Sequence, residues 1–264
     1  MYKLIICDLD DTLLDPMKQL PAGFDNFRQT LDERGIKFTL ATGRSNQSVQ
    51  PFIDVLNIDL PYASSNGAVI MQKGQKIHCF KMALGPLRPL IEIAQSMGIT
   101  VIYVVDGVEY AANLTDFIQK PNPANLSTQI YRPIVARDWQ ELKVDKVFLA
   151  DPNSGVGLSR LYALANNLGP HYHYHCFEDW AMDIVSRQVD KGNALKWIAQ
   201  YLQLAPQEVL AVGDGENDLP MIQAAGHGFA VANAILELQL QADSIAKAAY
   251  GQGVIEECLR LIQA

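Results

Sequence analysis

The sequence predicts an α/β fold in which a parallel sheet is covered by helices and a second domain is inserted between its two halves. Both ends of the 264-residue chain alternate short apolar runs with amphipathic segments, which is typical of strand–helix crossovers that feed a parallel sheet. The middle of the chain instead carries hairpin-turn signals beside helical segments, which indicates antiparallel strand pairing. The predicted class is therefore a Rossmann-like, doubly wound parallel sheet with an inserted α+β domain.

Four short segments are almost continuously apolar, as strands that are covered on both faces must be. They lie at residues 3–7, 37–41, 209–212 and 228–231. Between them, apolar residues recur near helical spacing, and Gly35 and Gly226 stand where helices would stop. The predicted covering helices occupy residues 21–34, 45–56, 191–204 and 217–225.

The central part of the chain has a different pattern. Turn signals lie at residues 65–68 and 105–108, and helical patterns lie at residues 85–97 and 157–168. We expect the inserted domain to span residues 83–187, and the sheet domain to combine residues 1–82 and 188–264. Both sizes are ordinary for a domain.

Composition excludes several classes of protein. With 49% hydrophobic and 19% charged residues, the chain is neither disordered nor fibrous. A net charge of -8 opposes binding to nucleic acid, and no apolar run approaches the ~20 residues that span a bilayer, so no membrane partner is expected. The four cysteines form no C-x-x-C pair, which fits reduced thiols in the cytoplasm. We expect a monomer or a weak homodimer.

Three carboxylates directly follow the first predicted strand, where open α/β sheets bind ligands. Residues two apart along an extended strand point the same way, so Asp8 and Asp10 face one crevice while Leu9 points inward. Two crowded carboxylates either share a proton or jointly hold a cation. The alternative interpretation is an acidic helix N-cap.

Other polar residues follow further predicted strands or open predicted helices. Thr42 and Gly43 offer a hydroxyl and an approachable amide at a helix N-terminus, which attracts phosphate. Lys191 opens a helix, where a cation is disfavoured unless it faces an anion. Each has a plainer alternative, a helix cap for Thr42 and a solvated surface side chain for Lys191.

A second acidic loop, residues 213–218, follows the third strand of the predicted sheet. An EF-hand is excluded, because Leu219 would stand where that loop needs glycine. Oxygen ligands with no histidine or cysteine nearby favour Mg²⁺ over zinc. The sequence therefore predicts a hard-cation site that Asp214 shares with Asp8 and Asp10.

Taken in order, these segments resemble the four motifs of the haloacid dehalogenase superfamily. They read Asp8-x-Asp10-x-Thr12, Thr42-Gly43, Lys191 and Gly213-Asp214-x-x-Asn217-Asp218. The large insert is similar to the α/β cap of the Cof-type sugar-phosphatase branch. One departure is Asp11, which stands where glycine is commoner in the family.

The resemblance implies a mechanism and a site. Asp8 is the expected nucleophile, which forms an aspartyl-phosphate, and Asp10 is the expected general acid and base. Mg²⁺ would be held by the Asp8 carboxylate, the Asp10 backbone carbonyl and Asp214, with Asp218 supporting these ligands from behind. The phosphate oxygens would contact five residues, Leu9 and Gly43 through their amides, and Thr42, Lys191 and Asn217.

The implied function is a Mg²⁺-dependent phosphatase that hydrolyses small phosphorylated metabolites such as sugar phosphates. One alternative is a phosphomutase or phosphotransferase, which shares the aspartyl-phosphate but passes it to an acceptor hydroxyl. Another is a signalling module that uses phosphorylation as a switch.

Some residues stay outside the predicted site. His171, His173 and His175 alternate with tyrosines, which predicts a half-exposed strand, with substrate contact and adventitious metal binding as alternatives. Arg44 and Asp183 either face the crevice or are surface ion-pair or strand-edge charges, and they are left out of the predicted site. The three tryptophans are interpreted as packing residues, since no basic residues interleave with them.

Overall fold

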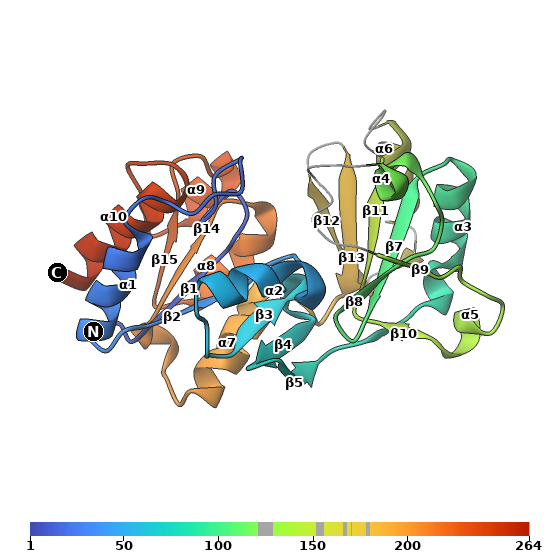
Figure 1. The fold of residues 1–264 in the computed structure, drawn as a ribbon. Helices are drawn as coiled ribbons and strands as arrows, with labels where there is room; N and C mark the ends of the chain where they lie inside the picture. Colours follow the sequence, from blue (N-terminus) through green and yellow to red (C-terminus); the bar gives the residue numbers. More distant parts are fainter. Residues whose placement is uncertain (121–128, 152–155, 166–167, 170, 178–179, 264) are drawn as a thin grey trace.

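The computed structural model describes residues 1–264 except 121–128, 152–155, 166–167, 170, 178–179 and 264. Two large hydrophobic clusters divide most of the described chain, and a third, small one contains Ile102, Phe117 and Ala150. The larger one joins residues between Leu4 and Met71 with residues between Val185 and Cys258, and the second joins residues between Met82 and Ile184. We call the corresponding bodies, which lie side by side in Figure 1, the core lobe and the cap lobe. None of the helices within the described ranges is long and apolar enough to cross a bilayer.

The core lobe is built on a parallel sheet with the strand order β16-β15-β14-β1-β2. Its strands are β1 (Leu4–Cys7), β2 (Lys37–Leu40), β14 (Val209–Gly213), β15 (His227–Ala230) and β16 (Ser244–Ile245). Cys7 at the end of β1 lies between Leu40 of β2 and Val212 of β14. The loops that follow these three strands therefore leave the sheet at one edge.

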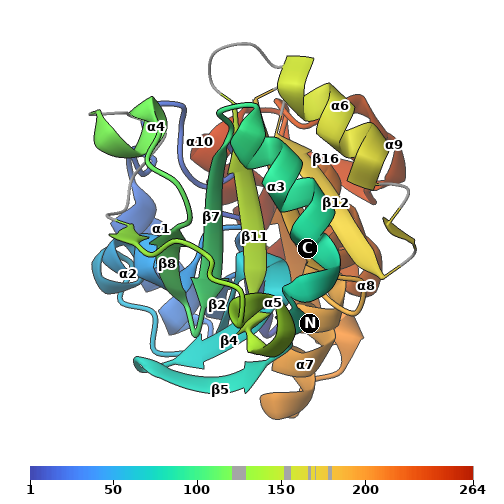
Figure 2. The ribbon, with the colours of Figure 1, turned by 90° about the vertical axis from the view of Figure 1, so that its right-hand side faces the viewer.

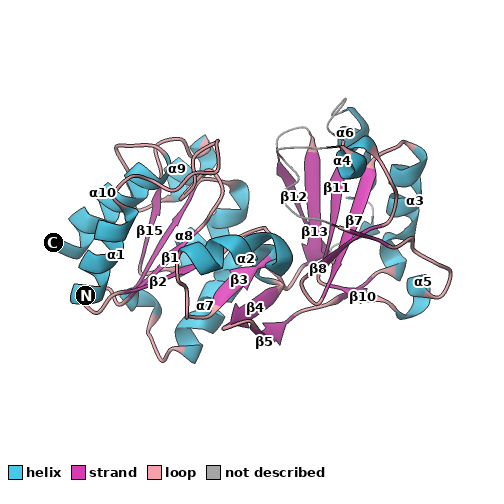
Figure 3. Ribbon diagram, in the orientation of Figure 1, coloured by secondary structure: helices cyan, strands magenta, loops and turns pink. Residues whose placement is uncertain are grey.

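Helices cover both faces of this sheet (Figures 1 and 3), which confirms the predicted doubly wound α/β class. They are α1 (Phe24–Glu33), α2 (Asn46–Val55), α7 (Lys191–Tyr201), α8 (Leu219–Ala224), α9 (Leu236–Gln241) and α10 (Tyr250–Gln263). Each predicted strand agrees with the structure to within one residue at either end.

Two predicted helices begin later than expected, for identifiable reasons. Helix α1 begins at Phe24 rather than at residue 21, because Gly23 has a φ of 83°, which cannot continue a right-handed helix. The predicted helix 217–225 is divided into a 3₁₀ turn, Glu216–Asp218, and α8. Pro220 lacks an N–H group and fits only the first turn of a helix, so the α-helix begins at Leu219.

A small antiparallel sheet of three strands extends the core lobe: β3 (Tyr62–Ser64), β4 (Val69–Gln72) and β5 (Gln75–Cys79). The predicted turn between β3 and β4 is present, with left-handed φ angles at Ser65, Asn66 and Gly67. A bridge from Ala41 to Ala63 attaches this sheet to the end of β2. The turn therefore lies next to the loop that carries Thr42.

The cap lobe is built on a sheet with the strand order β12-β13-β11-β7-β8-β9. Its strands are β7 (Thr100–Val105), β8 (Val108–Ala111), β9 (Ile130–Tyr131), β11 (Lys146–Ala150), β12 (Tyr172–Phe177) and β13 (Ala181–Ser186). All neighbours pair antiparallel except β8 and β9. A separate pair, β6 (Met82–Ala83) and β10 (Lys143–Val144), lies at the base of the lobe. The predicted turn at 105–108 joins β7 to β8, with left-handed φ angles at Asp106 and Gly107.

Two helices, α3 (Arg88–Ser96) and α6 (Val156–Ala165), cover the face of the cap sheet that is turned away from the core lobe (Figure 2). They match the predicted helices 85–97 and 157–168, apart from residues 166–167, which lie outside the described residues, and a 3₁₀ turn at Gly85–Leu87. Short helices α4 (Asp116–Gln119) and α5 (Asp138–Glu141) complete the lobe. The opposite face of the cap sheet looks toward the core lobe.

Polar contacts join the two lobes. The Lys146 ammonium of β11 donates to the Gly43 carbonyl at 2.8 Å and to the Asp183 carboxylate at 2.7 Å. Asn66 donates to the same carboxylate at 2.9 Å. In a second contact between the lobes, Ser45, which precedes α2, donates to Glu109 of β8 at 2.6 Å. The cap sheet is thus fastened to the loop that follows β2.

Replacing Lys146 by methionine is expected to lower the free energy of unfolding by about 3–5 kcal/mol, because Asp183 is fully buried and would lose its cation. Urea unfolding at pH 8 measures this. As a control, Lys120→Met removes an exposed i,i+4 pair with Asp116 and should cost no more than about 0.5 kcal/mol. Equal effects of the two substitutions would contradict the importance of the buried pair.

Candidate active site

The loop after β1 presents two carboxylates and buries the residue between them. Asp8 and Asp10 both line a cavity of about 810 Å³ between the lobes, whereas the Leu9 side chain is fully buried in the core cluster. The Asp8 amide still donates to the Val212 carbonyl, so Asp8 continues the pairing of β1 with β14. This is the alternation that the sequence predicts.

Lys191 bridges two buried carboxylates beneath the cavity. Its ammonium donates to Asp8 Oδ1 and to Asp218 Oδ1, both at 2.6 Å, and only 1% of the residue is exposed. Burial alone would lower the pKa of Lys191, but the two carboxylates outweigh it and raise the pKa. Lys191 is therefore charged, and it is no surface lysine. It opens helix α7, whose first turn is capped by the Asp190 side chain.

Asp214 completes a cluster of acidic groups. Oxygens of Asp8, Asp214 and Asp218 lie within 4.8 Å of one another. Burial and the neighbouring Asp218 raise the pKa of Asp214 to about 7. Burial also raises the pKa of Asp8, with Lys191 opposing and the two other carboxylates adding to the increase. Negative charge is thus in excess of the single buried ammonium.

This excess of carboxylate oxygens suits a small divalent cation such as Mg²⁺, which prefers hard oxygen ligands. Asp8 and Asp214 both line the cavity and are available to such an ion. Asp218 is engaged elsewhere, because its second oxygen accepts the amides of Asp214 and Gly215 at 3.0 Å. Its role in supporting the metal ligands stays a prediction.

The Asp10 carboxylate lies apart from this cluster. The Arg44 guanidinium grips it through two hydrogen bonds of 2.6 Å, and the Lys18 ammonium lies 3.0 Å away. Although burial opposes them, these cations hold the pKa of Asp10 below its usual value. The Arg44 guanidinium also lies over the Phe52 ring at 4.6 Å. Asp10 is therefore ionised in this arrangement.

The residues expected to bind phosphate occupy different positions. Thr42, Gly43 and Asn217 line the cavity next to Asp8, while Lys191 lies behind it. Asn217 donates to Asn66 Oδ1 at 2.9 Å, and the same oxygen would lie only 3.2 Å from a Cβ added at Gly43. A side chain at Gly43 would thus push against Asn66 and narrow the approach to the Gly43 amide.

The backbone of Asp11 explains a departure from the family pattern. Asp11 has a φ of 55°, in the left-handed region that favours glycine, and aspartate is one of the few other residues that tolerate it. Its carbonyl accepts a hydrogen bond from Asn233 at 2.7 Å, and Asn233 in turn accepts the Tyr250 amide. Asn233 therefore links the loop after β1 to the start of α10.

For two residues, sequence reasoning left open whether they face the cavity. Arg44 was left outside the site, but it grips Asp10 and lines the cavity. Its position directly after Thr42-Gly43, at a helix N-terminus, was the available signal. Asp183 also lines the cavity, but as a fully buried carboxylate paired with Lys146 rather than as a surface or strand-edge charge. Only the pairing of distant cap strands brings these two together, and no local pattern reports it.

Two of the three alternating histidines, His173 and His175, lie in strand β12, which is the strand predicted for this segment. His173 and His175 share one face, with ring centroids 6.1 Å apart, and His175 lines the cavity. The tyrosines of the opposite face pack against the cap cluster. His171 is exposed and precedes the strand. Trp180, interpreted as a packing residue, also lines the cavity.

Comparisons with known proteins agree with this geometry. The family described as haloacid dehalogenase-like hydrolase matches residues 5–257. A Bacillus subtilis protein named "Putative phosphatase YxeH" is 29% identical over 90% of both chains. The phosphoglycolate phosphatase of Methanopyrus kandleri is 24% identical over 100% of this chain and 98% of its own.

A solved structure has the same fold over nearly the whole chain. It is a haloacid dehalogenase-like hydrolase from Bacteroides thetaiotaomicron, with 25% identity, a TM-score of 0.82, and coverage of 99% of this chain and 100% of its own. The resemblance inferred from the motifs is therefore confirmed. With the family matching from β1 to α10, and with acidic loops meeting at one sheet edge, the chain belongs to the haloacid dehalogenase-like hydrolases.

Proposed function

We propose that this protein is a Mg²⁺-dependent phosphatase that hydrolyses small phosphorylated metabolites through an aspartyl-phosphate on Asp8. The observation that carries the proposal is the buried Asp8 carboxylate, held by Lys191 and open to the cavity beside Asp214. Two relatives that span most of the chain carry phosphatase names, which supports the same reaction.

In the first step, the Asp8 carboxylate attacks the phosphorus and the leaving alkoxide departs. Lys191 donates to Asp8 Oδ1 and thereby fixes the orientation of the attacking carboxylate. The ammonium also offsets negative charge as the two anions meet. When bound, Mg²⁺ would be held by the Asp8 carboxylate, the Asp10 carbonyl and Asp214, and it supplies further neutralisation of the phosphate.

The equatorial phosphate oxygens gain charge in the transition state, so donors must be aimed at them. The Thr42 hydroxyl, the Asn217 amide and the backbone amides of Leu9 and Gly43 serve this purpose in the proposal. Because Asn66 already holds the Asn217 side chain, its amide is oriented before the substrate arrives.

Asp10 protonates the leaving oxygen and later takes a proton from the water that attacks the aspartyl-phosphate. That attack breaks the bond between phosphorus and the Asp8 oxygen and releases inorganic phosphate. With Arg44 gripping both carboxylate oxygens, Asp10 is set up as the base. For the acid step it must carry a proton, so Arg44 has to release it. An incoming phosphate is the anion that competes for Arg44, and it thereby links substrate binding to the protonation of Asp10.

We further propose that residues 83–187 act as a cap domain on the domain formed by residues 1–82 and 188–264. The cap sheet then closes the cavity above Asp8 and limits the entry of water. The hydrogen bonds of Lys146 and Glu109 to the loop after β2 support this arrangement.

The first test is phosphate release from acetyl phosphate and p-nitrophenyl phosphate by the wild type and by Asp8→Asn. We expect Mg²⁺-dependent release that EDTA removes, and a loss of at least about 10³-fold in kcat for Asp8→Asn, because the nucleophile is gone. Asp25→Asn, an exposed residue of α1, should be unaffected. Transfer to added glycerol that exceeds release would favour the phosphotransferase alternative, and full activity of Asp8→Asn would refute the proposal.

A second prediction concerns stability. The pKa of Asp214 is about 7 in the folded protein and about 3.9 in an unfolded chain, so the folded state holds an extra proton between these values. Without a divalent cation, stability should therefore fall as the pH rises from about 4 to about 7. At pH 8, Mg²⁺ at 100 times its dissociation constant should restore about 2.7 kcal/mol. Thermal unfolding with Mg²⁺ or EDTA measures this, and an undiminished Mg²⁺ effect in Asp214→Asn would contradict it.

A third prediction concerns Arg44. Because Arg44 lowers the pKa of Asp10, Arg44→Gln should move the acid limb of the kcat–pH profile to higher pH at saturating Mg²⁺. Arg34→Gln is the matched control. Among the hydrogen bonds described, the Arg34 side chain donates only to the Ile262 carbonyl, near the C-terminus. A lower kcat with an unmoved acid limb would mean that Arg44 acts on the phosphate alone.

A further inference from the structure

The part of the cavity that the cap lobe supplies is mainly apolar and aromatic. Six of its side chains are hydrophobic: Ile102, Val104, Phe117, Phe148, Phe177 and Trp180. The core lobe supplies the opposite, acidic and hydroxyl-bearing side around Asp8. A substrate that reaches from one side to the other therefore places its phosphate on the core lobe and its leaving group against aromatic rings.

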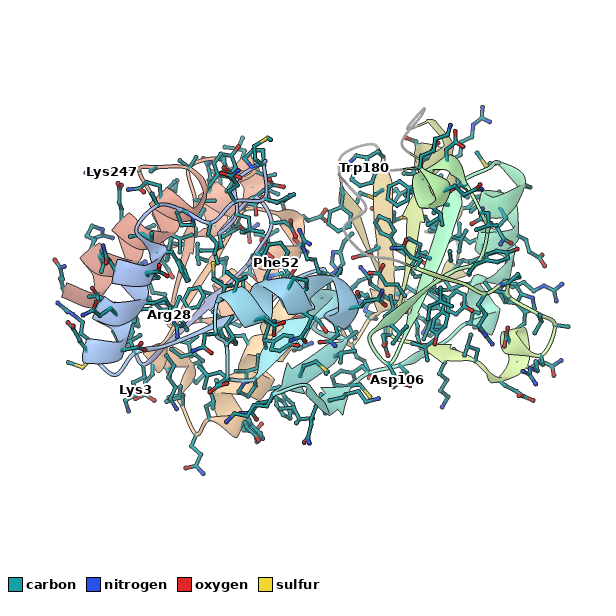
Figure 4. The ribbon with its side chains drawn as sticks, viewed as in Figure 1. Lys3, Arg28, Phe52, Asp106, Trp180 and Lys247 are labelled. Atoms are coloured by element: carbon teal, nitrogen blue, oxygen red, sulfur yellow. The ribbon has the colours of Figure 1, made fainter. Side chains whose placement is uncertain are left out.

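Three of these rings form a cluster. Phe117, Phe148 and Trp180 have centroids 6.2 to 6.4 Å apart, with Phe148 and Trp180 nearly perpendicular at 80°. Phe117 is buried, while Phe148 and Trp180 are half-buried and keep part of their surface open to the cavity. Figure 4 shows Trp180 near the end of the cap sheet. Such a cluster offers faces and edges for a further ring.

The charged groups on the cap side are already engaged in holding the lobes together. The Lys146 ammonium has three acceptors, the Gly43 carbonyl and both oxygens of Asp183. Glu109 accepts from Ser45 and from Gln129. Sugar hydroxyls need polar partners to replace their water. Lys146 could donate to one only by giving up an existing bond, and each Glu109 oxygen already accepts one hydrogen bond.

His175 is different, because its Nε2 atom is buried without a hydrogen-bond partner in the described structure. The ring lines the cavity beside Phe177 and Cys176. Burial lowers the pKa of His175 to about 4, so the imidazole is neutral at physiological pH. It offers one polar atom at the edge of an aromatic surface, which suits a heteroatom on a flat ring.

We infer that the preferred substrate is a phosphomonoester whose leaving group carries a planar aromatic or heteroaromatic ring, packed against Phe148 and Trp180, with a ring heteroatom or hydroxyl facing His175. The inference rests on the proposed phosphatase function and narrows its substrate class away from simple sugar phosphates. A cavity of about 810 Å³ has room for a ring system of this kind together with its phosphate.

The test compares four probes with the wild-type protein and Mg²⁺: acetyl phosphate, glucose 6-phosphate, pyridoxal 5′-phosphate and flavin mononucleotide. Acetyl phosphate is too small to depend on the cap and reports the basal reaction. We expect kcat/KM for at least one of the two aromatic probes to exceed that for glucose 6-phosphate by about tenfold or more. Equal or higher kcat/KM for glucose 6-phosphate would overturn the inference.

Two matched variants locate the effect. Trp180→Leu should lower kcat/KM for the preferred aromatic probe about tenfold more than it lowers kcat/KM for acetyl phosphate. Trp139→Leu changes the same residue type in the same lobe, at a position that contacts Arg88 and is not among the cavity-lining residues, and it should change neither. Equal losses with acetyl phosphate and the aromatic probe in Trp180→Leu would indicate a structural role and contradict the inference.

A binding measurement separates this inference from the proposed reaction. Calorimetric titration of Asp8→Asn, which lacks the nucleophile, should give a dissociation constant at least about tenfold lower for the preferred aromatic probe than for glucose 6-phosphate. If this preference is found but the wild type releases no phosphate from any probe, ring recognition is supported and the proposed reaction is wrong. If acetyl phosphate is hydrolysed without any preference in binding or turnover, the reaction is supported and the inference is wrong.

Discussion

The buried ammonium of Lys191 is the interaction on which the site depends. It lies between Asp8 and Asp218 at the edge where the strands end, and it offsets only part of the charge that three carboxylates gather there. Close packing brings it to this place. A Cβ added at Gly192 would lie 2.3 Å from the Pro220 carbonyl, and one at Gly213 would lie 2.4 Å from Asp218. Gly192 lets the first turn of α7 touch the start of α8, and Gly213 lets the loop after β14 fold back on Asp218, so Lys191 reaches both carboxylates. The remaining negative charge is what makes this edge fit for a divalent cation.

In the proposed function, each lobe contacts a different part of the substrate. The core lobe gathers charge and donors suited to a phosphate, whereas the polar groups of the cap lobe are used in holding the lobes together. Lys146 and Glu109 are each engaged in contacts with the loop that follows β2. Among the described residues, the cap surface left for the rest of a substrate is therefore mainly apolar and aromatic, with the unpaired Nε2 atom of His175 at its edge. Polar side chains on this face of the cap sheet that bond to the core lobe are less available to bind the leaving group of a substrate.

Much of this could be predicted because the chemistry lies in short segments that follow strands. Continuous apolar runs identified the parallel strands, and the carboxyl ends of such strands meet at one edge, so Asp8, Thr42 and Asp214 were brought together by topology alone. The pairing of Asp183 with Lys146 could not be found in the same way. It depends on β11 and β13 being neighbours in a sheet, and antiparallel order within an insert leaves no local signal. The aromatic surface was missed for the same reason, since Phe117, Phe148 and Trp180 come from three separate segments. The domain boundaries and the catalytic roles stay predictions.

The phosphate-binding loop and the cap sheet are not independent bodies. Asn217 donates to Asn66, which donates to Asp183 on the cap sheet. Asp183 accepts from Lys146, which returns to the carbonyl of Gly43. This chain of hydrogen bonds therefore begins at Asn217 and ends at Gly43, two residues expected to contact phosphate. It passes through the buried ion pair of Lys146 and Asp183 in the cap lobe. Since a buried charge is costly once its partner moves away, the pair favours one position of the cap over others. The groups expected to bind phosphate are consequently held in place by the same contacts that hold the cap lobe above them.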